Sequence, residues 1–303
     1  MKRWLTTTLF LVIVGACRAH EPPSVSGDGT PASPPSGQDR ELRILTWNIY
    51  MLPGFLPKRQ VERAEVIADS VAGSGYDILV FQEAFNHGAV RVIRSGLGSA
   101  YPYMYGPFNR GGSPVRFSSG VWVLSRIPLR LVGTIEFGSA KSFDRAARKG
   151  AALLEGEWNG RAFQLLGTHL QADDHPSVRE AQFRELSTGL LLPFKREGVP
   201  QIICGDMNTE STREEEYRSM IEELCAEDGR IEGPQKTSYD ARSNRLADKV
   251  WENTCSTVDY VLLRLNGALI RSVKRSIRVF KCPGRKGDLD LSDHYGVACT
   301  LYF

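Results

Sequence analysis

The sequence predicts an α/β fold in which two sheets pack face to face and carry helices on their outer faces. Apolar runs of strand length recur from residue 42 to residue 301. Three segments between these runs space their apolar residues as amphipathic helices do. A strand-rich chain with helices outside its sheets is typical of a two-sheet α/β sandwich.

The first part of the domain is predicted to run strand, helix, strand. Residues 42–49 and 78–82 are apolar and partly β-branched, as buried strands are. Between these two runs the apolar residues recur at helical spacing, at Val61, Ala64, Ile67, Ala68 and Val71. This order is the repeating unit of α/β proteins.

The middle of the chain is predicted to contain strands without helices. Gly, Pro and Asn turns separate four runs of strand length, at residues 121–124, 129–137, 151–158 and 163–168. Because no helix intervenes, we expect these four strands to form an antiparallel meander.

The last part is predicted to combine helices and strands. Residues 179–192 align Phe183, Leu186, Leu190 and Leu191 on one helical face, and a strand at 201–204 follows. Residues 214–224 predict a second amphipathic helix, with Ser211 or Thr212 as its cap. Further strands are expected at residues 258–263, 272–280 and 295–301.

The first forty residues are predicted to be an export signal and a tether. Residues 1–16 have a basic start and an apolar stretch too short to span a bilayer. The small-residue pattern that ends at Cys17 resembles the bacterial lipoprotein processing site, so we expect Cys17 to be acylated. Residues 17–40 are rich in Pro, Ser and Gly and predict a disordered, lipid-anchored tether. The protein is therefore expected to be an envelope lipoprotein, or, if an ordinary signal peptide is cut a few residues later, a secreted protein.

Composition indicates one domain of nearly balanced charge. Residues 41–303 are about the upper size for one hydrophobic core, and no second composition shift interrupts them. The whole chain has 38 basic and 35 acidic residues, and loss of residues 1–16 removes only two basic ones. This balance argues against a strongly electrostatic binder of polyanions.

Five cysteines follow Cys17, and because this number is odd, at least one of them is expected to be a free thiol. Cys204 and Cys299 fall within strand patterns and are expected to be small buried hydrophobic residues. Cys255 and Cys282 lie in polar surroundings on either side of a strand pair, which makes them the one disulfide candidate.

The most informative motif is the sequence Leu291, Ser292, Asp293, His294. A carboxylate that accepts from one ring nitrogen fixes the tautomer of a histidine, so the other nitrogen can take a proton from water. Such a dipeptide is common by itself. Four further polar clusters, however, end apolar runs, at residues 46–50, 81–83, 167–171 and 205–208. Five clusters at strand ends predict one site at one rim of the sheets.

Two of these clusters predict a metal site. Glu83 leaves the end of a buried strand, where an unpaired carboxylate is unstable, so it is either paired or bound to a metal. Asn48 ends the neighbouring strand and offers an amide oxygen, a hard ligand that suits Mg²⁺. The alternative is a salt bridge for Glu83 and a turn for Asn48.

Two other clusters predict groups that act on a phosphoryl centre. Asp206 and Asn208 are two residues apart, so in an extended chain their side chains share a face. Together they can hold a metal or a phosphate oxygen. His169 follows the strand at 163–168 and can donate to a phosphoryl oxygen or protonate a leaving alkoxide.

Taken in order, these residues resemble the exonuclease, endonuclease and phosphatase superfamily over residues 42–303. The matching set is Asn48, Glu83, His169, Asp206, Asn208, Asp259, Ser292, Asp293 and His294. The resemblance implies a four-layered α/β sandwich of two mixed, mainly antiparallel sheets with helices on the outer faces, and metal-dependent hydrolysis of phosphoesters. The superfamily includes deoxyribonucleases, inositol polyphosphate phosphatases and neutral sphingomyelinases, and the fold does not choose among them.

Longer stretches are similar to bacterial sphingomyelinases C, at residues 46–53, 81–85, 118–121 and 167–173. Asp144, followed five residues later by Lys149, looks like the switch pair of that group, although a weak surface ion pair is the alternative. In that group an exposed aromatic hairpin precedes the Ser-Asp-His motif. Here only Phe280 is available for insertion into a membrane, and an anchor at Cys17 is a substitute.

The resemblance implies a phosphodiesterase that splits sphingomyelin, or a related choline phospholipid, into phosphocholine and ceramide. His294 would activate water and Asp293 would orient it, while one or two Mg²⁺ ions bind Glu83 and Asn48. Asp206, Asn208 and His169 would stabilise the phosphorane-like state, and Asp259 would brace His169 unless it only caps a strand. The protein is expected to act as a monomer on a membrane surface rather than on nucleic acid.

Two alternatives remain open. A secreted, deoxyribonuclease-like endonuclease of the same fold would need arginines and lysines along a groove to meet successive phosphates. A catalytically silent adhesion lipoprotein would be indicated by the loss of one of the polar elements, and none is missing.

Overall fold

The computed structural model describes residues 41–54, 59–111, 116–247, 254–282 and 289–303. The predicted signal peptide, the lipidation site Cys17 and the tether lie outside the described residues. None of the helices in the described segments is long and apolar enough to cross a membrane.

The first sheet is built around the two apolar runs at the start of the domain. β1 (Glu41–Met51) and β2 (Ile78–Ala84) pair in parallel, because α1 (Gln60–Ala72) carries the chain back between them. β16 (Gly296–Tyr302) pairs antiparallel with β1 on its other side. The full strand order is β3-β4-β2-β1-β16-β13-β9, with β3 at Tyr103–Tyr105, β4 at Trp122–Ser125, β9 at Ile231–Glu232 and β13 at Ser272–Arg278.

The second sheet has the order β12-β8-β7-β6-β5. Its strands are β5 (Arg130–Glu136), β6 (Gly150–Trp158), β7 (Arg161–His169), β8 (Gln201–Asp206) and β12 (Asp259–Arg264). β7 and β8 are parallel, because α3 (Pro176–Leu186) and the π-helical turn η3 (Ser187–Leu191) connect them. The other pairs in this sheet are antiparallel.

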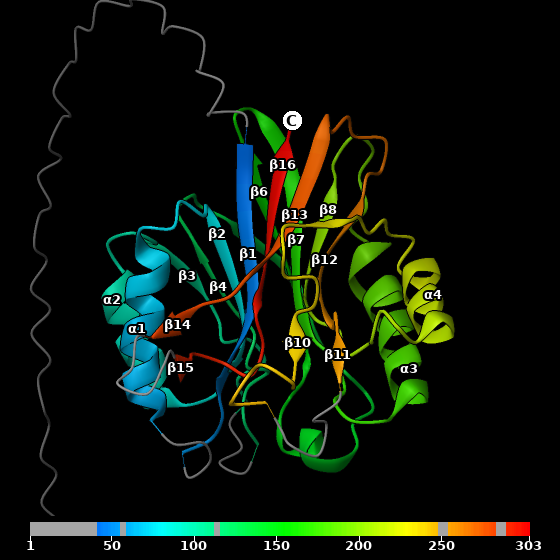
Figure 1. The fold of residues 1–303 in the computed structure, drawn as a ribbon. Coiled ribbons are helices and arrows are strands. Elements are labelled where there is room, and N and C mark those ends of the chain that lie inside the picture. The colour runs from blue at the N-terminus through cyan, green and yellow to red at the C-terminus, as the bar shows by residue number, and fades with distance from the viewer. Residues whose placement is uncertain (1–40, 55–58, 112–115, 248–253, 283–288) are drawn as a thin grey trace, which may run out of the picture. The chain divides into compact units, whose positions relative to one another are not determined.

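Three apolar cores hold four layers together (Figure 1). One core lies between the two sheets and includes Val80 of β2 and Leu165 of β7. A second core packs α1 and α2 (His87–Leu97) on the outer face of the first sheet. The third packs α3 and α4 (Glu214–Glu223) on the second sheet. The structure confirms the predicted four-layered sandwich of two mixed, mainly antiparallel sheets.

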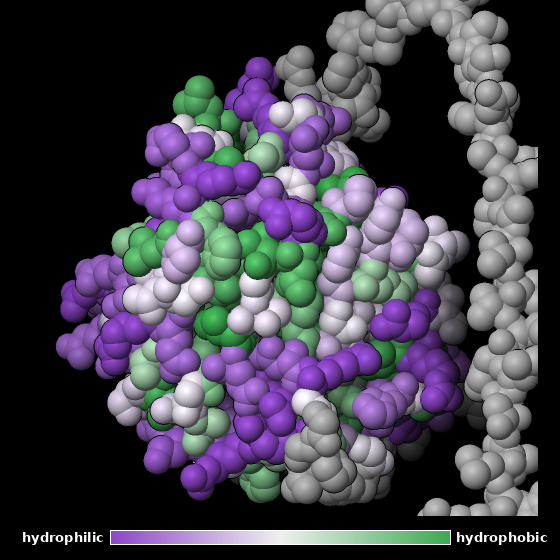
Figure 2. Space-filling model, turned by 180° about the vertical axis from the view of Figure 1, so that it is seen from behind, coloured by the Kyte–Doolittle hydropathy of each residue, from purple (hydrophilic) through white to green (hydrophobic). Residues whose placement is uncertain are grey.

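Some apolar side chains remain at the surface. Seen from behind, apolar side chains gather in a patch near the middle of the face, with hydrophilic side chains above and below it (Figure 2). Tyr103 of β3 and Leu131 of β5 are 39% and 46% exposed. Both belong to strands at the edges of their sheets, which neighbouring strands cover on one side only.

The prediction that four strands form one meander is wrong, because the first of them, β4, belongs to the other sheet. β4 pairs with β2 and β3 in the first sheet, and only β5, β6 and β7 form a meander in the second. β4 is buried on both faces in the first sheet. Val123 faces the core between the sheets, while Trp122 and Leu124 face the core under the helices. A short 3-10 helix, η2 (Ser142–Ala146), also interrupts the segment expected to lack helices.

Two smaller predictions are also wrong. Ser211 and Thr212 do not cap α4, since its cap residue is Arg213 without a side-chain cap bond, and both hydroxyls instead lie within 3.5 Å of Ser256 Oγ. Within the described residues no disulfide joins Cys255 to Cys282. Their strands β11 (Cys255–Ser256) and β14 (Lys281–Cys282) belong to two separate small sheets, completed by β10 (Tyr239–Asp240) and β15 (Leu289–Asp290). Cys204 and Cys299 are buried, as predicted.

Candidate active site

The five polar clusters meet at one end of the sandwich. Strand register places His169 beside Asp206 and Asp206 beside Asp259, on three neighbouring strands. The turn before β16 brings His294 to the same end. Together they enclose a cavity of about 270 Å³, whose lining includes Tyr50, Glu83, His169, Asp206, Asn208, Tyr239, Asp293 and His294.

Asp259 holds the imidazole of His294. Its Oδ2 lies 2.8 Å from Nδ1 of His294, and both side chains are buried. Asp259 therefore does not brace His169, and Asp293 is not the orienting carboxylate, so both expectations are corrected. Residues 291–293 form a bend, so the neighbouring side chains of Asp293 and His294 point in different directions. Asp293, whose Oδ1 accepts from Ser292 Oγ, turns toward Glu83 instead.

The backbone of the Ser-Asp-His turn is fastened to β1. Ser292 Oγ donates to the carbonyl of Asn48 at 2.6 Å and accepts from the backbone N–H of His294. The indole Nε1 of Trp47 donates to the carbonyl of His294 at 3.0 Å. These buried bonds join residues about 245 positions apart in the chain, and they fix the height of the imidazole above the sheet.

Three carboxylates surround the ring of His294. Burial by itself lowers the pKa of this histidine, but Asp259, Asp206 and Asp293 outweigh burial and raise the pKa well above its ordinary value. Nε2, the nitrogen that Asp259 does not bind, lies 3.8 Å from Asp206 Oδ2. Without a compensating positive charge the ring therefore holds a proton, and it becomes a base only when such a charge offsets the carboxylates.

Asp206 connects three of the predicted residues. Its Oδ2 accepts from Asn48 Nδ2 at 3.0 Å and lies 3.5 Å from His169 Nε2. Its Oδ1 accepts from the backbone N–H of Asn208. Asn208 has a φ of 49°, so the chain turns after Asp206 rather than continuing as a strand. The expectation of an extended segment is wrong, and the turn is what brings both residues to the cavity.

Glu83 carries a buried carboxyl group with one unpartnered oxygen. It is the next-to-last residue of β2, with a φ of 57°, and its buried Oε2 has no hydrogen-bond partner among the described residues. Burial, followed by the charge of Asp293, raises its pKa to about 8. Gly120 permits this placement, because a Cβ there would lie 2.7 Å from the ring of Phe85 and 3.2 Å from Cα of Glu83.

The donors around Glu83 fit a divalent cation. Burial and the charge of Asp293 raise the pKa of Glu83, and a hard cation bound at oxygen ligands would stabilise both carboxylates. Asn48, the other predicted ligand, is buried next to Glu83, and its Oδ1 accepts from the backbone N–H of Tyr50. Asp206, Asp259 and His294 form a second donor group, whose ligand atoms lie within 4.8 Å of one another.

Lys149 and Asp144 lie behind His169. Lys149 Nζ contacts Asp144 Oδ2 at 2.8 Å, His169 Nε2 at 3.0 Å and the carbonyl of Leu170 at 2.7 Å. Its side chain is 3% exposed, so the alternative of a weak surface ion pair is wrong. Since an ammonium only donates, Nε2 of a neutral His169 accepts from Lys149. Burial and then Lys149 lower the pKa of His169 to about 4, which keeps the ring neutral.

We expect the substitution Lys149→Met to raise the pKa of His169. The change removes the positive charge at Nε2, while Asp206, which favours the charged ring, stays in place. NMR titration of the His169 ring protons measures this change, and the exposed His87 serves as the reference. Turnover should fall by about 10- to 100-fold, because a displaced catalytic group lowers rates by that much. An unchanged His169 titration would show that Lys149 does not control this ring.

Two buried arginines that were not expected from the sequence hold the backbone around the cavity. Arg63 of α1 donates to the carbonyl of Leu291 at 2.6 Å and to that of Tyr50 at 2.6 Å. Arg179 of α3 pairs with Glu216 and donates to the carbonyl of Asp173 at 2.6 Å. The sequence contains a sign of both, because each arginine falls on the buried face of its helix, where a charged residue is rare unless it is paired.

The structure also places two apolar side chains differently from the sequence-based prediction. Val61 was placed on the apolar stripe of α1, but its side chain is 44% exposed. Phe280 was expected to be available for membrane insertion, but its ring stacks on Trp47 with centroids 4.6 Å apart. Tyr239 packs edge-on against the His294 ring, and no sequence motif marks it.

The fold and the site define a class of enzyme. A four-layered sandwich that gathers carboxylates, amides and a carboxylate-bound histidine at its strand ends is the framework of a hydrolase. The chain belongs to the endonuclease/exonuclease/phosphatase family, whose model matches residues 45–294. It is thus a hydrolase of this superfamily.

Curated relatives and solved structures narrow this class. The chain is 26% identical over 292 residues to a phospholipase C of Staphylococcus aureus, covering 86% of this chain and 87% of the relative. It is 26% identical over 316 residues to a sphingomyelinase C of Bacillus cereus, covering 91% and 93%. The crystal structure of sphingomyelinase C from Streptomyces griseocarneus superposes with a TM-score of 0.74 at 25% identity, covering 86% of this chain and 99% of that one. These similarities support a phospholipase-type hydrolase.

Proposed function

We propose that the protein hydrolyses the phosphodiester of sphingomyelin, or of a related choline phospholipid, and releases phosphocholine in a Mg²⁺-dependent reaction. The observation that carries this proposal is one cavity in which Glu83, with its unpartnered Oε2, lies near Asp293 and near His294, which Asp259 holds. The names of the relatives support the lipid substrate. A related beta toxin of Staphylococcus aureus has been crystallised with bound magnesium ions.

Glu83 and Asn48 are the proposed ligands of the cation. When bound, Mg²⁺ would neutralise carboxylate charge and the charge that develops on the phosphoryl oxygens. The chain itself supplies the rest of the chemistry. Asp259 fixes the Nδ1–H tautomer of His294, so that Nε2 faces the cavity and can accept the proton of the attacking water.

Other residues position the phosphoryl group. The amide of Asn208 is held at the carbonyl of Leu170, and Asp206 is held by Asn48, so both are oriented before substrate arrives. His169 remains neutral and is fixed by Lys149. Such preorganised groups lower the barrier because they need no rearrangement during the reaction.

One assay tests the proposed activity. The purified protein is incubated separately with sphingomyelin, phosphatidylcholine and plasmid DNA, each with Mg²⁺ and with chelator. We expect phosphocholine release from sphingomyelin with Mg²⁺ and none with chelator. Rapid nicking of DNA with intact sphingomyelin would instead identify the endonuclease alternative.

We also propose that the protein is exported and anchored through Cys17. Its relatives include a toxin and sphingomyelinases, and the small-residue pattern before Cys17 supports an acylation site. Stable anchoring needs more than one acyl chain, since one chain binds only marginally. As a flexible coil, a tether of roughly two dozen residues has a root-mean-square span of about 25–30 Å, which would keep the enzyme close to its envelope.

We expect the substitution Cys17→Ser to move the protein from the membrane fraction to the soluble fraction. The change removes the only thiol at the end of the signal-like stretch. Fractionation of cells that express either form, followed by immunoblotting, measures the distribution. Cys225→Ser, at an exposed cysteine of the folded domain, is the control and should leave the distribution unchanged. Equal recovery of wild type and Cys17→Ser in the soluble fraction would rule out the anchor.

A further inference from the structure

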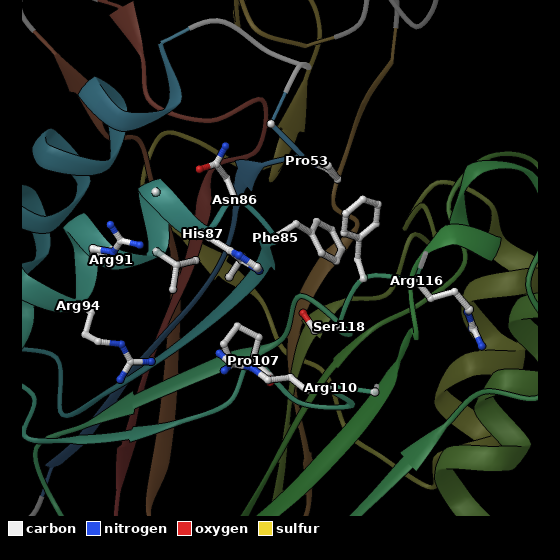
Figure 3. Close-up of a pocket in the computed structure, with 16 residues that line it drawn as sticks. Pro53, Phe85, Asn86, His87, Arg91, Arg94, Pro107, Arg110, Arg116 and Ser118 are labelled. Carbon is white, nitrogen blue, oxygen red and sulfur yellow. The ribbon is translucent and has the colours of Figure 1, made fainter. Parts of the chain in front are cut away.

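A second cavity, of about 1150 Å³, opens beside the active site (Figure 3). It shares no lining residue with the active-site cavity, yet Ala84 and Phe85 in its wall directly follow Glu83. We call this cavity the basic cleft, and its wall includes Phe85, His87, Arg91, Arg94, Arg110 and Phe117.

The basic cleft concentrates positive charge that has no acidic partner. Arg91 and Arg94 extend from α2, and Arg110 extends from the opposite wall toward them (Figure 3). Arg94 stacks over Trp122 and Arg110 donates to the carbonyl of Pro107. Within the described part of the chain, none of these three arginines forms an ion pair with a carboxylate, whereas Arg116 at the rim pairs with Glu136 at 2.8 Å. Three neighbouring uncompensated cations favour an anionic ligand.

Aromatic residues next to the arginines indicate what kind of anion fits. The rings of Phe85 and Phe117 lie 6.3 Å apart in the cleft wall. The backbone N–H of Phe117 donates to the carbonyl of Ala146, which joins this wall to η2. On η2 the side chain of Phe143 is 94% exposed. An exposed aromatic ring on an element joined to the wall of a cationic cavity suits the boundary of a bilayer, where apolar chains and charged headgroups meet.

We infer that the basic cleft binds the headgroup of an anionic phospholipid and thereby holds the active site against a bilayer. The inference rests on the proposed function, because it supplies a membrane contact for an enzyme that acts on lipid. Phe280 cannot supply that contact while it stacks on Trp47. The endonuclease alternative would place cations in a row along successive phosphates, whereas three arginines that converge in one cavity fit a single headgroup.

Vesicle binding tests this inference without requiring turnover. The full chain carries Cys17→Ser, so that acylation there cannot contribute, and chelator is present throughout. Vesicles contain either phosphatidylcholine and sphingomyelin, or the same lipids with about one-fifth phosphatidylglycerol. The double variant Arg91→Gln, Arg110→Gln should bind the anionic vesicles about 25-fold more weakly, since each basic residue near such a surface contributes roughly fivefold. Its binding to the neutral vesicles should not change.

Matched controls separate the cleft from net charge and from misfolding. Arg161 is exposed at the other end of β7, so Arg161→Gln should leave vesicle binding near wild type. Arg91→Lys keeps the charge and should retain most of the binding. Thermal unfolding of the double variant should match wild type, because both arginines are exposed and no ion pair is lost.

Two results would overturn the inference. One is equal binding of wild type and double variant to anionic vesicles. The other is a double variant that loses affinity for a DNA duplex while its vesicle binding is unchanged, which would assign the cleft to nucleic acid. A protein that binds anionic vesicles through these arginines but leaves sphingomyelin intact would contradict the proposed function and not the role of the cleft.

Discussion

The substitution His294→Ala is expected to lower turnover by at least about 100-fold, because proton transfer by a positioned side chain contributes that much or more. Nε2 of this ring faces the cavity, and Asp259 holds Nδ1 at 2.8 Å. Turnover of sphingomyelin in vesicles measures the effect, and circular dichroism establishes that the fold survives. His175→Ala is the control, because the His175 ring contacts the exposed Ser142 hydroxyl and does not line the active-site cavity. Near-normal turnover in a folded His294→Ala protein would remove His294 from the mechanism.

The partner of His294 can be identified by a second pair of variants. Asp259→Asn replaces the carboxylate that fixes the tautomer, so we expect a turnover loss close to that of His294→Ala and a changed pH profile. Asp293→Asn leaves the bond between Asp259 and His294 intact, so it should lower turnover less and shift the pH profile only by removing one of the charges that raise the pKa of His294. If Asp293→Asn shifts the pH profile and Asp259→Asn does not, Asp293 would be the orienting residue after all.

The substitution Glu83→Gln is expected to abolish Mg²⁺ binding and to lower turnover by at least about 100-fold, since Glu83 is the proposed ligand whose buried Oε2 has no hydrogen-bond partner among the described residues. Binding of Mg²⁺ stabilises a folded protein in proportion to its affinity, so thermal unfolding gives a readout that does not depend on activity. Wild type should gain melting temperature with added Mg²⁺, and Glu83→Gln should not. Glu65→Gln, at an exposed site on α1, is the matched control.

The same variant should change how stability depends on pH in the presence of chelator. The folded pKa of Glu83 is about 8, above its ordinary value of 4.5. As pH rises from 4.5, the unfolded chain loses this proton while the folded chain keeps it, so the free energy of unfolding falls until about pH 8. Glu83→Gln lacks this group and should lose less stability over that range. Identical pH slopes for the two proteins in urea titrations would show that the carboxylate is already compensated.

Much of the fold followed from local patterns in the sequence. Apolar runs located the strands at the start and end of the domain, because each is buried on both sides of its sheet. β4 was assigned to the wrong sheet because a run that is buried on both faces carries no pattern that indicates the sheet to which it belongs. Pairing with β2 involves residues about 45 positions away, and no turn or spacing in the sequence encodes that choice.

For the site, the sequence by itself determined which polar residues end the strands. Ends of neighbouring parallel strands share one rim, so His169 and Asp206 had to lie close together, whereas the packing of the two sheets brings Glu83 to them. Only the tertiary structure decided how these residues pair. Asp259 rather than Asp293 holds His294, and Lys149 is buried against His169, because strand register and side-chain direction join residues that are distant in the chain. Sequence neighbours point apart, and the hydrogen bonds that set each pKa form only after the sheets have packed.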